Sequence, residues 1–171
     1  MPSPLLPSFL IGLTAGARAL TPLAAVSEAA RRGVLPARGR AIRWLGHPAT
    51  AAATKLLAAG ELWGDKLRSA PDRIVPAGIA ARLVTGAIAG AALAPRRQWA
   101  LGALLGAAAA AGAAYLTFDA RTRAMRRFGQ TPTGLVEDAL TVAAAQSIVA
   151  AAARPAVTQR PRLARLRGQA A

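Results

Sequence analysis

Residues 99–118 read WALGALLGAAAAAGAAYLTF, and none of these twenty residues is charged. A helix of about 20 apolar residues is long enough to cross the ~30 Å hydrocarbon core of a bilayer. Trp99 opens the stretch, and Tyr115 and Phe118 lie at its other end. Aromatic side chains gather at both membrane interfaces in this way. The stretch therefore predicts a transmembrane helix.

Four further apolar segments surround this one, at residues 5–30, 48–63, 74–94 and 134–153. A helix of a soluble protein normally keeps a polar face, whereas residues 74–94, 99–118 and most of 134–153 are apolar all round. Of the 171 residues, 54% are hydrophobic, most of them Ala, and 16 are Gly. Ala favours helices, and the residues that favour strands are few. We predict an all-α, polytopic membrane helix bundle with four to five transmembrane helices. Residues 48–63 are short and contain Lys55, so they either cross fully or lie at the interface.

The composition also excludes several kinds of site. The chain has no Cys and one His, which excludes disulfides, thiolate metal sites and His-based zinc centres. We assign no catalytic residue, no metal ligand and no cofactor from the sequence.

The net charge of +15 comes from 22 Lys and Arg against 7 Asp and Glu. The basic residues cluster between the apolar segments, as in loops that flank membrane spans and contact anionic headgroups. A nucleic-acid-binding chain would scatter them, so we expect no nucleic acid partner. We predict one transmembrane domain over residues 1–153 and a flexible, basic, cytoplasmic tail over 154–171. With five spans, the larger basic clusters place the N-terminus outside and the C-terminus in the cytoplasm.

Pairs of glycines recur at the GxxxG spacing in four segments. They are Gly12 and Gly16, Gly60 and Gly64, Gly86 and Gly90, and Gly102 and Gly106. In lipid this spacing lets helix backbones approach closely. The pairs predict a tightly packed Ala/Gly-rich bundle and a homodimer through GxxxG faces.

A few polar residues interrupt the apolar segments, where a charge costs ~2.5–3.5 kcal/mol on insertion scales and faces protein or water. Arg18 lies four residues before Pro22. Because proline has no N–H, it frees the Arg18 carbonyl from helical bonding. This pattern predicts either a polar breach inside the bundle or a helix that ends near Leu20 with Arg18 reaching the headgroups.

The stretch GELWGDKLRSAPDR places Glu61 and Asp65 four residues apart, on one face of a helix. Two like charges there repel unless a cation lies between them. Nearby residues can supply it (Lys66, Arg68 or Arg73), or another helix can (Arg18 or Arg82). The group is either an interfacial charge cluster or an inward-facing site.

Two more positions are candidates. Arg82 shares a helix face with Gly86 and Gly90, so it points into the bundle if that face packs on a neighbour. We expect its partner to be Glu61, Asp65 or Glu137. Glu137 and Asp138 open the last segment, where acids in a first helical turn complement the helix dipole. They are alternatively part of the same polar cluster.

These residues together resemble a family. The order is GLTAGARALTPLAAV, then GELWGDKL followed by Pro71 and Arg73, then ARLVTGAIAGAAL, then Tyr115 and Arg121, then LVEDAL. It is similar to the bacterial integral-membrane family catalogued as domain of unknown function 4126, from about Phe9 to Ala153. The resemblance implies a multi-pass protein of the bacterial cytoplasmic (inner) membrane and carries over no catalytic residue. It implies a shared polar site made of Arg18, Pro22, Glu61, Asp65, Lys66, Arg73, Arg82, Glu137 and Asp138.

Three functions follow from this pattern. The first is binding or transport of a small solute, an ion or a lipid headgroup through a charged intramembrane cavity, because broken helices and midplane charges are typical of transporters. The second is a structural or partner-binding role, in which ion pairs set the helix register. The third is an enzyme acting on anionic lipid phosphates, which Arg residues would bind. The sequence does not choose among them.

Overall fold

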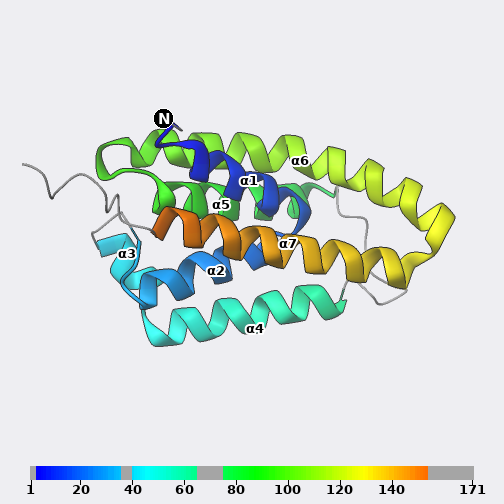
Figure 1. The fold of residues 1–171 in the computed structure, drawn as a ribbon, viewed down its shortest axis with the longest axis horizontal. Helices are drawn as coiled ribbons and strands as arrows, with labels where there is room; N and C mark the ends of the chain where they lie inside the picture. The colour runs from blue at the N-terminus through cyan, green and yellow to red at the C-terminus, as the bar shows by residue number, and fades with distance from the viewer. Residues whose placement is uncertain (1–2, 36–39, 65–74, 154–171) are drawn as a thin grey trace, which may run out of the picture.

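The structure is a computed structural model that describes residues 3–35, 40–64 and 75–153 (Figure 1). Within these ranges every regular element is helical, which confirms the all-α bundle. The α-helices are α1 Leu6–Ala17, α2 Leu20–Arg31, α3 Arg40–Leu45, α4 Pro48–Gly64, α5 Pro76–Leu93, α6 Trp99–Phe128 and α7 Gln130–Ala153, with a 3-10 turn, η1 Arg96–Gln98, before α6.

Three of the helical segments described are long and apolar enough to cross a membrane. They are α5, the segment Arg96–Phe128 that contains α6, and α7. The 17-residue helix α4 is not among them, and α1 is a shorter apolar helix. Helix α6 continues ten residues past the predicted segment and spans 30 residues, about 45 Å. It is therefore longer than the hydrocarbon core, and its last turns carry Arg121, Arg123, Arg126 and Arg127.

Helices α1 and α2 form a hairpin. Helix α1 runs beside α6 in the same direction, because Ser8 approaches Gly102 while Gly16 approaches Ala113. The chain then reverses, and α2 returns alongside α7 toward the end where α1 began (Figure 1). The segment predicted as a first span is thus two short helices of 12 residues each, whose tip lies inside the bundle.

The hairpin returns the chain to the end of the bundle at which it began. Helix α1 begins and helix α7 ends at the same end of the bundle (Figure 1). The turn of η1 and the end of α2 also lie at this end. The placement of the N-terminus outside and of the C-terminus in the cytoplasm stays a prediction, and residues 154–171 lie outside the described residues.

Glycine pairs hold α1, α5 and α6 together. A Cβ atom on Gly86 would lie 2.7 Å from the Gly106 carbonyl oxygen, and one on Gly16 would lie 2.6 Å from the Ala110 oxygen. The predicted tight packing is therefore confirmed for three of the four pairs, all inside one chain. A Cβ atom on Gly60 or Gly64 of α4 would have no described atom within 4 Å. A homodimer through GxxxG faces stays a prediction, and only the α4 pair leaves such a face open.

Substitution of Gly106 tests this packing. Gly106→Ala places a methyl group 3.1 Å from the Gly90 Cα atom, and such overpacking destabilises by about 1–3 kcal/mol. Gly112→Ala is the matched control, because it lies on the same helix with open space around it. Thermal unfolding of the purified protein in detergent should show a clearly lower melting temperature for Gly106→Ala and no decrease for Gly112→Ala. Equal melting temperatures for the two variants would contradict the helix contact.

Candidate functional site

The helical hairpin breaks at Arg18. Helix α1 ends at Ala17, Arg18 is extended with φ −139° and ψ 114°, and α2 begins at Leu20. Pro22 is the third residue of α2, within the first turn, where a missing N–H removes no helical bond. The Arg18 side chain is 1% exposed, so the break is a polar breach inside the bundle and not a helix end at the headgroups.

Glu61 from α4 caps the start of α2. Its Oε1 accepts a hydrogen bond from the Ala19 N–H at 2.9 Å, and its Oε2 accepts one from the Leu20 N–H at 2.8 Å. The first N–H groups of a helix have no partner within the helix, and the helix dipole makes this end partly positive. A carboxylate accepts hydrogen bonds from these N–H groups and carries the negative charge that the dipole favours. Glu61 therefore replaces the water that would solvate an exposed helix terminus.

Arg82 from α5 binds the end of α1, on the other side of the break. Its Nε donates to the Gly16 carbonyl oxygen at 2.9 Å, near the C-terminal end of α1, and its Nη1 donates to the Gly78 carbonyl oxygen at 2.9 Å. A cation is favourable at this partly negative end of a helix. Arg82 is 6% exposed, which confirms that it points into the bundle. Both of these acceptors are backbone carbonyls. Asp65, one of the carboxylates expected as its partner, lies outside the described residues, so that expectation stays a prediction.

The Arg18 side chain reaches α7. Its Nη2 donates to Asp138 Oδ1 and lies 3.9 Å from Glu137 Oε2. Arg121 from α6 donates to the same Glu137 oxygen at 2.8 Å. Glu137 thus joins two arginines from different parts of the chain. We call Arg18, Glu61, Arg82, Arg121, Glu137 and Asp138 the tip cluster.

The tip cluster brings together most of the predicted site. Its three cations and three anions balance, and they come from the hairpin tip and from the helices α4, α5, α6 and α7. Asp65, Lys66 and Arg73 lie outside the described residues. Among the residues the structure describes, no three His, Asp or Glu side chains gather as metal ligands.

The expectation that Glu137 and Asp138 lie in a first helical turn is wrong. Helix α7 begins at Gln130, four residues before the predicted segment, so both acids lie beyond its first turn. Asp138 is 8% exposed and faces the bundle. The acids therefore pair with arginines and do not complement the end of their own helix.

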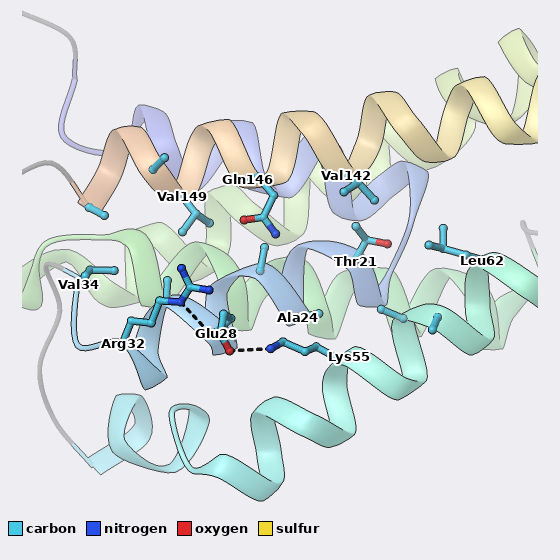
Figure 2. A pocket seen from close by; sticks show the side chains of 16 residues that line it. Thr21, Ala24, Glu28, Arg32, Val34, Lys55, Leu62, Val142, Gln146 and Val149 are labelled. Atoms are coloured by element: carbon cyan, nitrogen blue, oxygen red, sulfur yellow. Dashed lines mark hydrogen bonds and ion pairs between the residues drawn. The ribbon is translucent and has the colours of Figure 1, made fainter.

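A second feature lies beside the hairpin. A cavity of about 470 Å³ lies between α2, α4 and α7, with α2 behind the other two (Figure 2). We call it the α2–α4–α7 groove. Its inner end, toward the hairpin tip, is lined by Thr21, Leu62 and Val142. The Thr21 hydroxyl oxygen there is covered by protein, so this end presents mainly carbon atoms. Ala residues of the three helices line most of the rest.

The outer end of the groove is charged. Glu28 accepts hydrogen bonds from Arg31 Nη2 at 2.7 Å, Arg32 Nε at 2.6 Å and Lys55 Nζ at 2.8 Å, and Figure 2 shows the last two. The Glu28 side chain is 12% exposed, whereas those of Arg32 and Lys55 are 66% and 53% exposed. One buried carboxylate thus holds three cations, and the group carries a net charge of +2.

Glu28 lies near the end of α2, outside the helices that could cross a membrane. Arg31, Lys55 and Arg32 bind its carboxylate and hold the pKa of Glu28 far below its ordinary value. The carboxyl group therefore stays ionised at physiological pH. This cluster was missed in the sequence, although Glu28 stands three and four residues before Arg31 and Arg32, the spacing of helical ion pairs.

Removing the Glu61 carboxylate tests the capping of α2. Glu61→Ala leaves two buried N–H groups without their acceptor, and each such group costs about 1–3 kcal/mol. Asp119→Ala is the control, because Asp119 is 58% exposed and pairs with Arg123 on the surface of α6. Chemical unfolding in detergent should show a loss of about 2 kcal/mol or more for Glu61→Ala and almost none for Asp119→Ala. If both variants unfold alike, Glu61 is not a helix cap.

A double-mutant cycle tests the Arg18–Asp138 pair. Breaking a buried pair by removing one partner costs about 3–5 kcal/mol, whereas replacing both partners with apolar residues is often neutral. Arg18→Met and Asp138→Leu should therefore each destabilise the protein, and the double variant should be more stable than either. If the loss of unfolding free energy in the double variant equals the sum of the two single losses, the two side chains do not stabilise each other.

The comparisons with known proteins add no relative. No protein-family model, curated protein or solved structure matches the chain. The resemblance to the family of domain of unknown function 4126 therefore stays a prediction.

Proposed function

We propose that the protein is an integral membrane protein that binds an anionic lipid in the α2–α4–α7 groove. The observation that carries this proposal is the pairing of an apolar channel with a net positive end. An amphiphile has the same division, with hydrocarbon at one end and a charged headgroup at the other. A small hydrophilic ion would leave the Ala-lined part of the groove without a partner.

Embedding in a bilayer is supported by the outer surface of the long helices. Leu104 and Leu116 on α6 are 67% and 72% exposed, and Leu140 on α7 is 66% exposed. In water such apolar surface would be unfavourable, whereas in lipid it is at no disadvantage. The groove is bordered by α7, one of these long helices, so a lipid can enter it from the side without leaving the membrane.

The hairpin and the arginines support one orientation of the bundle in the membrane. Arg31, Arg32, Arg43, Arg96 and Arg97 lie at the end of the bundle where the described chain begins and ends, beside Glu28, the single acid that the structure describes there. The other end has four arginines on the last turns of α6, two of which pair with Glu137 and Asp119, so its net positive charge is smaller. Basic clusters collect on the cytoplasmic side. We place the end with the larger positive charge in the cytoplasm of a bacterium, together with the basic tail and the N-terminus. The charged end of the groove then faces the cytoplasmic leaflet, where anionic lipids attract Lys and Arg.

The tip cluster supports the structural alternative more than transport or catalysis. Arg18 and Arg82, the arginines that an enzyme would use for phosphate, are engaged with a carboxylate and with backbone carbonyls. The described groove includes neither of them, nor Glu61. We assign the tip cluster to holding the broken helix in place, and ligand binding to the groove.

Removing the groove cations tests the binding. A double variant, Arg32→Ala with Lys55→Ala, removes the two cations that line the groove. Its control, Arg123→Ala with Arg126→Ala, removes two arginines at the other end of the bundle. Native mass spectrometry with phosphatidylglycerol should show about a tenfold or greater loss of lipid affinity for the groove variant, since each cation contributes ~1 kcal/mol to binding of an anionic lipid. Equal losses for the two variants would mean that the protein attracts anionic lipid only through its overall charge.

A further inference from the structure

One polar side chain in the groove is not explained by the charged end. Gln146 lies in the interior of α7, a helix apolar enough to cross a membrane, and it is exposed. Figure 2 shows its carboxamide pointing from α7 into the groove, toward α2. Within the ranges that the structure describes, the carboxamide forms no hydrogen bond to protein.

Such a position is unfavourable unless something in the groove pairs with the carboxamide. Moving an amide from water into an apolar medium without a hydrogen bond is unfavourable. Ser147, the next residue of α7, is also exposed but does not line the groove. Gln146 is thus positioned to pair with an occupant of the groove.

The depth of Gln146 indicates which part of a lipid it meets. Helix α7 ends at Ala153, which lines the groove together with Arg32. Gln146 lies seven residues before that end, about 10 Å deeper along the helix axis. Arg32 is the C-cap residue of α2. A phosphate bound by the cations therefore lies nearer the aqueous side than the Gln146 carboxamide.

In a glycerophospholipid the ester carbonyls lie immediately on the hydrocarbon side of the phosphate. We propose that Gln146 donates a hydrogen bond from its amide nitrogen to an ester carbonyl oxygen of a bound anionic glycerophospholipid. The groove then selects acyl-ester lipids over anionic lipids that have no carbonyl below the phosphate, such as ether-linked or isoprenoid phosphates. This inference rests on the lipid binding proposed above and adds the class of lipid.

The test compares two lipids that differ only in the carbonyl groups. Native mass spectrometry of the full-length protein measures binding of diacyl phosphatidylglycerol and of its dialkyl ether analogue. We expect the wild type to prefer the ester by about threefold to tenfold, the contribution of one hydrogen bond. Gln146→Met, which keeps the length of the side chain, should abolish the preference. Ser147→Ala should keep it.

The outcomes separate the two proposals. If the wild type binds ester and ether lipids equally, but binding still depends on Arg32 and Lys55, the role of Gln146 is overturned and the lipid site stands. If an isoprenoid phosphate binds more tightly than the ester lipid, the lipid class is overturned. If neither phosphatidylglycerol binds, or if binding ignores Arg32 and Lys55, the groove is not a lipid site. The wild-type comparison is decisive even if Gln146→Met fails to fold.

Discussion

The fold depends on how the two backbone ends at the hairpin tip are satisfied. In the low dielectric of a bilayer or a packed interior, an unpaired N–H or C=O is expensive, so irregular backbone persists only where protein or water pairs with it. Here Glu61 accepts from the first N–H groups of α2, and Arg82 donates to the Gly16 carbonyl at the end of α1. The two side chains carry the charges that the respective helix dipoles favour. Without them, unpaired N–H and C=O groups at the tip would make a reversal of the chain inside the bundle unfavourable.

The rest of the architecture follows from the hairpin. The glycines of α1, α5 and α6 let the first arm of the hairpin approach its neighbours at backbone distance. The second arm, α2, lies between α4 and α7 and forms the floor of the groove (Figure 2). Arg18 extends from the tip to α7 and fixes the level at which the two meet. The structural role of the tip cluster and the binding role of the groove are therefore different consequences of one broken helix.

Much of this arrangement could be predicted from local sequence patterns. The helical content, the break between Arg18 and Pro22, the inward direction of Arg82 and the glycine contacts all follow from spacing and residue type. The reversal at the break could not be predicted, because the carboxylate that pairs with the start of α2 belongs to Glu61, which lies far downstream in the chain. The start of α7 at Gln130 was also missed, and with it the inward direction of Glu137 and Asp138. The groove was missed because α2, α4 and α7 are brought together only by tertiary packing.

The side of the membrane on which each end of the hairpin lies can be measured directly. The chain contains no Cys, so single cysteines can be introduced without background labelling. Ser3→Cys and Val34→Cys place exposed thiols before α1 and after α2. A membrane-impermeant maleimide, applied to sealed vesicles of known orientation, reports the side on which each thiol lies. A re-entrant hairpin predicts that both thiols react from the same side of the membrane. Reaction from opposite sides would mean that residues 5–30 cross the membrane once, which would contradict this account.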